Sequence, residues 1–315
     1  MNELWDRFVS RFVSRPLQIL TSPLVACGLV AMLFIGGAAF AWDKYGYQIL
    51  QDPRFLVSSE NIEITPTPDW IRSNVKDEVV RDGILENLSI RDSQLVEKVA
   101  DAFAVHSWVG EVKRVQKQSG KRTPHGEEDQ IVKIVVELAY RRPIAMVEVV
   151  SGGKRGLIPV DVGGVILPTI DFSPSETRDY LRLTVPNVQP YGVVGTEWGD
   201  QRVHQAARIA EAWGESWQEL QLYRIVVLAA SPIETRNDDY EFELQTKQGA
   251  RVLWGSSPGR EKPGEASAAE KVAQFTEYVN KRGPLDNTGI PGRIDLRSGT
   301  PLTNSSRTAT LPTRE

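Results

Sequence analysis

The stretch "IVKIVVELAY", residues 131–140, is the clearest strand signal in the sequence. Every second residue is apolar and would share one face: Val132, Ile134, Val136, Leu138 and Tyr140. The polar Lys133 and Glu137 mark the opposite face. Strict alternation of this kind is typical of a strand that buries one face against a core. The segment therefore predicts a sheet, and its flanking segments decide what packs on it.

The segments around this strand predict a small α+β domain over residues 55–148. Upstream, residues 55–65 alternate as a strand, and Asp69 is a candidate N-cap for a helix over 69–79. A second amphipathic helix is expected over 92–103, and "SWVGEVKRVQ" and "PIAMVEVV" indicate further strands. The order is strand, helix, helix and then three strands, which favours helices on one face of a sheet.

Residues 149–299 predict a second, β-rich domain with two helices. Gly163-Gly164 indicates one hairpin, and "YEFELQTKQGARVLWG" indicates a clearer one. The helices are expected over 200–217 and 267–283, the second with Gly283 as its C-cap. The last predicted strand lies in "RIDLRSG", and the Ser/Thr-rich residues 300–315 are expected to be disordered.

The N-terminal region predicts a membrane anchor. No charged residue stands between Arg15 and Asp43, and residues 23–42 are densely apolar. Twenty helical residues span roughly 30 Å, the thickness of the hydrocarbon core. We therefore expect a cytoplasmic arm at 1–22, a transmembrane helix at 23–42 and a linker at 43–54. The excess of arginine before the apolar run places the N-terminus in the cytoplasm.

A cleaved signal peptide is the alternative for the same segment. Ala39-Phe40-Ala41 resembles a small-x-small cleavage site. Signal-peptide apolar cores run to about 15 residues, and this run is longer, which favours the anchor.

The composition and the motifs predict no enzyme. The net charge is -4, so the chain lacks the basic footprint of a nucleic-acid-binding protein. One cysteine and three widely separated histidines give no metal-ligand spacing. No nucleophile–base pattern and no phosphate-loop order is present. We therefore expect no catalytic residue, no metal, no cofactor and no small-molecule substrate.

The grouping of Asp295 with Arg293 and Arg297 in "RIDLRSG" could mark a reactive site or a strand face. Alternation sends Asp295 and Arg297 to one face, where they would keep a strand soluble and select its partner. The backbone edge of this strand is then its functional feature.

Several motifs occur in an order that resembles the FtsQ/DivIB family of bacterial cell-division proteins. "DPRFLVSSENIEI" resembles that family's entry into its POTRA domain, the polypeptide-transport-associated module. "HSWVGEVKRV" resembles its "hPWV" strand, and "ELAYRRPIAMVEV" its "ER-PvA" strand. "IPVDVGGVIL" resembles its "lVD..G.vf" hairpin, and "RIDLRSG" its "iDLRY..G", with Ser298 where an aromatic residue is common.

The resemblance implies a POTRA domain followed by a β domain, in a single-pass protein of the inner membrane at the division septum. It implies a non-enzymatic divisome scaffold that binds FtsB-like, FtsL-like or DivIC-like single-pass proteins and links them to septal wall synthesis. The implied partner-binding strand is Ile294, Asp295, Leu296 and Arg297. The implied POTRA motif positions are Trp108, Val109, Arg142, Pro143 and Ala145. Another POTRA-bearing envelope protein, in polypeptide transport or outer-membrane assembly, is the alternative.

Overall fold

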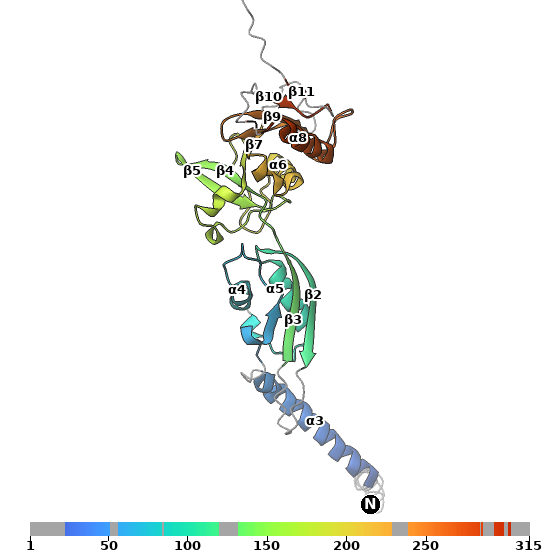
Figure 1. Ribbon diagram of the computed structural model, residues 1–315. Helices are drawn as coiled ribbons and strands as arrows, with labels where there is room; N and C mark the ends of the chain where they lie inside the picture. The colour runs from blue at the N-terminus through green and yellow to red at the C-terminus, as the bar shows by residue number, and fades with distance from the viewer. Residues whose placement is uncertain are drawn as a thin grey trace, which may run out of the picture.

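The computed structural model describes residues 23–50, 56–83, 85–119, 132–228, 239–283, 285, 293–298 and 302–303. The protein is α+β, and its described strands form a three-stranded sheet and an eight-stranded mixed sheet. An N-terminal helix, the smaller sheet and the larger sheet follow one another along the long axis of the molecule (Figure 1). The expected arm at residues 1–22 lies outside the described residues.

Helix α3, Pro23–Leu50, covers the segment in which we expect a membrane span. It continues eight residues past Trp42, so the expectation of a linker beginning at residue 43 is wrong as far as Leu50. The described side chains of its apolar run are exposed, among them Val30, Leu33 and Phe34. Within the described part of the chain, no helix is both long enough and apolar enough to cross a membrane. The span expected at 23–42 therefore gains no support from the structure.

The first domain is built around the strand on which the sequence analysis began. Strand β3, Val132–Tyr140, lies between β1, Ile62–Ile64, which is parallel to it, and β2, Val109–Ser119, which is antiparallel. Helices α4, Val75–Asp82, and α5, Leu95–Ala104, pack on this sheet (Figure 1). The predicted inner face is confirmed, because Ile134, Val136 and Leu138 are buried in a shared core with both helices.

Helix α4 begins later than its sequence predicts, and tertiary contacts explain the difference. Its N-cap is Asn74, whose Oδ1 accepts a hydrogen bond from Asp77 N at 3.2 Å, and not Asp69. The backbone N–H groups of Arg72 and Ser73 instead donate to Asp171, 3.1 and 2.8 Å away. Asp171 therefore accepts hydrogen bonds from backbone N–H groups that would otherwise lie in the first turn of a longer helix.

The second domain contains a sheet of eight described strands in the order β11-β10-β9-β8-β7-β6-β4-β5. The strands are β4 Ala145–Ser151, β5 Lys154–Val160, β6 Leu181–Thr184, β7 Leu222–Val227, β8 Phe242–Thr246, β9 Arg251–Gly255, β10 Arg293–Asp295 and β11 Leu302–Thr303. Strand β4 pairs with β5 and β6 and not with the first sheet. The boundary between the sheets therefore falls at residues 141–144, before the expected boundary at 148.

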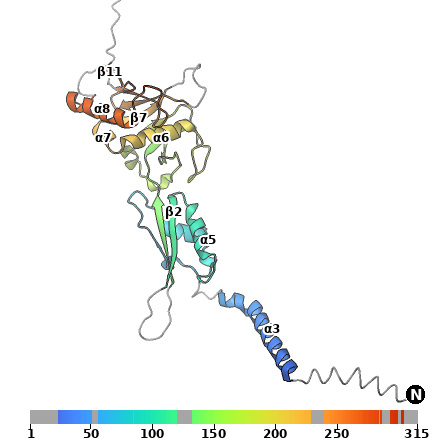
Figure 2. The same cartoon turned by 90° about the vertical axis from the view of Figure 1, so that its right-hand side faces the viewer.

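Helices α6, Gln201–Trp213, and α8, Ala268–Arg282, cover one face of this sheet, and α7, Ser216–Glu219, follows α6 (Figure 2). The Trp213 ring lies 5.4 Å from that of Trp254 and 5.6 Å from that of Phe275. Alternation sends apolar side chains of every long strand to this face, so the helices bury them. We call the opposite side, which carries residues such as Glu148, Arg182 and Glu243, the outer face.

The remaining predictions that the structure tests are two hairpins and one capped helix. The hairpin predicted at 240–255 is confirmed as β8–β9, and the capped helix predicted at 267–283 is confirmed as α8. The chain does turn back at the predicted Gly163-Gly164, where Val160 and Ile166 form an isolated antiparallel bridge, but the extended hairpin of β5 is with β4, across Gly152-Gly153. Both of those glycines have positive φ, 57° and 76°, as a tight hairpin turn requires.

Candidate partner-binding edge

The C-terminal edge of the eight-stranded sheet consists of β9, β10 and β11. Strand β10 runs parallel to β9, with Ile294 opposite Val252 and Asp295 opposite Leu253. On its other side it pairs antiparallel with the two residues of β11. The tail was expected to be disordered throughout, whereas Leu302 and Thr303 form this strand. The other residues of 300–315 lie outside the described part.

The four residues expected to form the partner-binding strand are brought together, but with two different roles. Ile294 and Leu296 are 1% and 0% exposed and fill the core beneath α8. The Asp295 and Arg297 side chains pair with each other, with Arg297 Nη2 2.8 Å from Asp295 Oδ2. The strand is thus fixed by its buried residues, and its charged residues lie away from the core.

The Asp295–Arg297 pair also orders the chain that follows β10. Arg297 N donates to Asp295 Oδ1 at 3.0 Å, and Arg297 Nη1 lies 3.5 Å from Glu241 Oε2. Burial acts to raise the pKa of the Asp295 carboxyl, but the hydrogen bonds from Arg297 outweigh burial and hold that pKa below its ordinary value. The pair is therefore ionised at neutral pH, and it fixes the turn at residues 297–298 that follows the strand.

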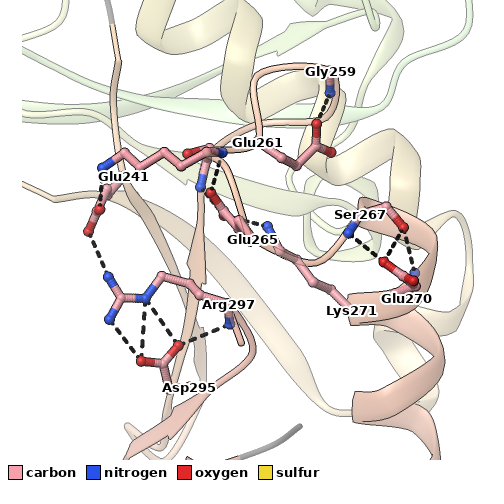
Figure 3. Close-up of polar contacts among 11 residues, drawn as sticks. Glu241, Gly259, Glu261, Glu265, Ser267, Glu270, Lys271, Asp295 and Arg297 are labelled. Carbon is pink, nitrogen blue, oxygen red and sulfur yellow. Dashed lines mark hydrogen bonds and ion pairs between the residues drawn. The ribbon is translucent and has the colours of Figure 1, made fainter. Parts of the chain in front are cut away.

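The loop between β9 and α8 and strand β9 itself both hold the backbone at the end of β10 (Figure 3). Ala266 N donates to Arg297 O at 2.9 Å, and Leu296 N donates to Leu253 O at 3.0 Å. The loop itself is ordered by Glu265. Its Oε1 accepts hydrogen bonds from Lys271 Nζ at 2.6 Å and from Ser256 N at 2.7 Å.

Glu265 and Lys271 form a buried ion pair beneath the edge. Their side chains are 5% and 0% exposed, and Lys271 Nζ lies 4.9 Å from the centre of the Trp254 ring. Burial acts to raise the pKa of Glu265, but hydrogen bonds from Lys271 and from backbone N–H groups hold it below its ordinary value. Paired, hydrogen-bonded charges of this kind are costly to break. The sequence analysis did not find this pair, because nothing in the local pattern marks it.

Gly255 is the point at which β9, Glu265 and Arg297 meet. Its φ is +89°, and a Cβ added there would collide with Glu265 Oε1 and lie 2.8 Å from Arg297 Cγ. Gly255→Ala is expected to destabilise the chain through both backbone strain and this collision, by about 1–3 kcal/mol more than strain alone. Urea unfolding of the full chain measures the difference.

Gly249→Ala is the matched control for this prediction. Gly249 has a similar φ of +94°, and an added Cβ would meet nothing within 4 Å. Gly249→Ala therefore measures the cost of a positive φ alone, which should lower the free energy of unfolding by about 1–2 kcal/mol. Equal losses for the two variants would show that the network around Gly255 does not hold the edge.

The expected POTRA motif positions lie outside the β10–β11 edge: Trp108 directly precedes β2, Val109 begins it, Arg142 and Pro143 connect β3 to β4, and Ala145 begins β4. Trp108 and Val109 are 0% and 1% exposed, and Trp108 Nε1 donates to Asp171 Oδ2 at 2.6 Å. Arg142 Nη2 lies 2.9 Å from Glu211 Oε2 on α6. Pro143 is buried, and Ala145 is a core residue of β4 in the second sheet. Trp108 and Arg142 therefore link the domains, Val109 and Ala145 each belong to the core of one domain, and the five positions form no shared exposed surface.

Asp171 organises this junction and escaped the sequence analysis. It lies in the short helix η4, Thr169–Asp171, and is 4% exposed. Besides Trp108 and the two backbone N–H groups before α4, it accepts a hydrogen bond from Ser73 Oγ at 3.3 Å. Its partners precede it by 63 to 99 residues, so no local pattern could reveal them.

No protein-family model matches this chain, and no curated protein matches it. Among the described residues, no group of three or more His, Cys, Asp and Glu side chains could hold a metal ion.

Proposed function

We propose that this chain is a non-enzymatic cell-division scaffold of the FtsQ/DivIB kind, whose C-terminal sheet edge receives a strand from a single-pass partner. The FtsB-like, FtsL-like or DivIC-like proteins named by the resemblance are the expected partners. The observation that carries the proposal is the C-terminal edge of the sheet, where β10 is held by hydrogen bonds from Ala266 and to Leu253 and where the described part of the outermost strand, β11, is two residues long.

Strand addition is the interaction that this edge favours physically. An edge strand presents N–H and C=O groups that a strand of another chain can pair with. Within the described residues β11 comprises Leu302 and Thr303, so a partner strand would add to the free edge of β11 and extend the sheet there. Main-chain hydrogen bonds would supply affinity, and the charges of Arg293 and Asp295 on the outer face would select side chains of the partner.

The first domain supports the same proposal. Its element order, strand, helix, helix, strand and strand, is the order that the resemblance implies for a POTRA domain. The proposal also includes a membrane tether at residues 23–42, with the bulk of the chain extracytoplasmic. Its support is the sequence alone, in the uncharged, apolar run between Arg15 and Asp43. Alkaline extraction of cell membranes tests the tether separately, and release of the chain into the soluble fraction would contradict it.

Site-specific photo-cross-linking tests the edge. A photoreactive residue at Thr303, in β11, is expected to capture a single-pass division protein in dividing cells. The same residue at Lys154 is the control, because Lys154 lies in β5 at the opposite edge of the same sheet. Equal yields from both positions, or none from Thr303, would contradict partner binding at the β10–β11 edge.

Imaging separates the division role from the alternative envelope role. A fluorescent fusion of the full chain is expected to concentrate at midcell before constriction. A signal spread evenly over the envelope would reject the division role and favour a POTRA-bearing protein of polypeptide transport.

A further inference from the structure

A pocket of about 750 Å³ lies on the outer face of the eight-stranded sheet, far along the sheet from the partner-binding edge. Its floor is formed by β4, β5, β6 and β7, and its wall by residues 169–177 and 185–187. Pockets of some 300–1,000 Å³ are the size that binds small molecules. Nothing in the proposed scaffold role uses this pocket.

Strand register concentrates positive charge in the pocket. Arg182 on β6 lies directly opposite Arg224 on β7, and Arg155 on β5 adds a third guanidinium to the lining. Glu148 is the one carboxylate among the described lining residues. Three cations and one anion leave an excess of two positive charges, in a chain whose net charge is -4.

Glu148 is already engaged by groups of the protein. Its Oε2 accepts a hydrogen bond from Thr184 Oγ1 at 2.6 Å, and its Oε1 accepts one from Arg182 Nη1 at 3.3 Å. Arg224 Nη1 lies 4.0 Å from Oε2. A single carboxylate shared in this way cannot neutralise both arginines, so the positive charge remains for a ligand.

The two central arginines are held in place before any ligand arrives. Their guanidinium carbons lie 4.8 and 5.0 Å from the centre of the same Tyr223 ring. Arg182 Nε is buried without a hydrogen-bond partner in the described part of the chain. Two like charges beside one ring repel each other, and an anion between them would relieve that repulsion. Guanidinium groups that are already ordered also lose less entropy on binding.

Apolar side chains also line the pocket, together with a few threonines and Asn187. Leu157, Phe172, Pro174, Val185 and Pro186 surround the charged floor. Phe172 is fixed by its neighbours, with ring centres 6.2 Å from Trp108 and 5.7 Å from Tyr180. A simple inorganic ion would leave this apolar wall in contact with water, whereas a ligand with an apolar body would cover it.

We propose that this pocket binds an organic anion, a carboxylate or phosphate ester carried on an apolar body, with its charged head between Arg155, Arg182 and Arg224. Guanidinium groups bind both kinds of head with paired hydrogen bonds. The two heads share one chemistry, and binding measurements can distinguish them.

The test uses the full chain and four probes: 4-propylphenyl phosphate, 4-propylbenzoate, the neutral 4-propylbenzyl alcohol and inorganic phosphate. Titration calorimetry is expected to show at least one organic anion binding about tenfold or more tightly than the alcohol and than inorganic phosphate. The better of the two organic anions identifies the head group. Similar binding of the alcohol would indicate adsorption to apolar surface, such as that of α3, and would overturn the proposal.

A pair of neighbouring residues supplies the variants. Arg155 and Lys154 are adjacent, exposed positions of β5, but only Arg155 lines the pocket. Arg155→Gln is expected to weaken binding of the organic anion about tenfold or more, because it removes a charge-assisted hydrogen bond to the anionic head. Lys154→Gln removes the same charge and should change the affinity less than about twofold. Equal effects of the two variants, or no binding of either anion at millimolar concentration, would overturn the proposal.

Discussion

Replacement of Lys271 by methionine is expected to lower the free energy of unfolding by about 3–5 kcal/mol. The lysine side chain is 0% exposed and its ammonium lies 2.6 Å from Glu265 Oε1. Methionine keeps the packing against Trp254 but leaves the buried Glu265 carboxylate without its cation, held only by Ser256 and by the backbone of Lys262. Because Glu265 orders the loop that clamps Arg297, the loss should also loosen β10. Urea unfolding of the full chain measures the first effect, and amide exchange at Ile294 and Leu296 measures the second.

Two further variants test whether the loss comes from the buried ion pair. Lys281→Met makes the same exchange on the same helix, at a side chain that is 71% exposed, and should change stability by less than about 0.5 kcal/mol. The double variant Lys271→Met/Glu265→Gln removes the orphaned charge and should recover about 1–2 kcal/mol. A loss for Lys271→Met no larger than that for Lys281→Met would contradict a structural role for the buried pair.

The acid limb of the stability curve reports on the same pair. The pKa of Glu265 is lower in the folded chain than its ordinary value of 4.5. A carboxyl group of this kind stabilises the fold above its ordinary pKa and loses that contribution as the pH falls through its folded pKa. Glu265→Gln should therefore flatten the fall in stability below about pH 4.5.

Replacement of Asp171 by alanine is expected to destabilise the chain by about 3 kcal/mol or more and to uncouple the two domains. The change leaves the buried Trp108 Nε1 without its acceptor, 2.6 Å away in the native chain, and frees the backbone N–H groups of Arg72 and Ser73. Unpaired buried donors cost about 1–3 kcal/mol each. Scanning calorimetry should show one transition in the native chain and two in the variant.

Asp179→Ala is the control for the junction. Asp179 is an exposed carboxylate at the end of the neighbouring short helix η5, Glu176–Asp179, so its removal should leave one transition and a nearly unchanged midpoint. A single cooperative transition in Asp171→Ala as well would show that Asp171 does not couple the domains.

The sequence predicts what depends on local pattern. The alternation over 131–140 gives β3 its inner face, and Gly283 ends α8 as expected, with a φ of +84° and its N–H donating to Val279 O. These features need only neighbouring residues, so they can be found without a tertiary structure. The alternation of Ile294 and Leu296 with charged residues likewise anticipates which side of β10 is buried.

The sequence does not predict what depends on distant partners. The pattern of β4 marks a strand, but its parallel pairing with β6 assigns it to the second sheet. Strand β11 carries little signal of its own, because pairing with β10 creates it. The hydropathy that suggests an apolar span ends at Trp42, whereas the backbone of α3 stays helical to Leu50. Asp171 and the outer-face arginines follow the same rule, since strands and loops far apart in sequence bring their partners together.

The order of strands in the large sheet follows the order of synthesis. After the β4–β5 hairpin, each of β6, β7, β8, β9, β10 and β11 is laid beside a strand already made. A chain emerging from a ribosome or a secretion pore can therefore add strands to this sheet in one direction. Each new strand pairs with a strand that has already formed. The growing edge stays open until the last residues emerge. Chains that stop after β8 or β9 would expose that strand as an edge without the hydrogen bonds and ion pairs that order β10, so we expect them to self-associate more readily than the full chain.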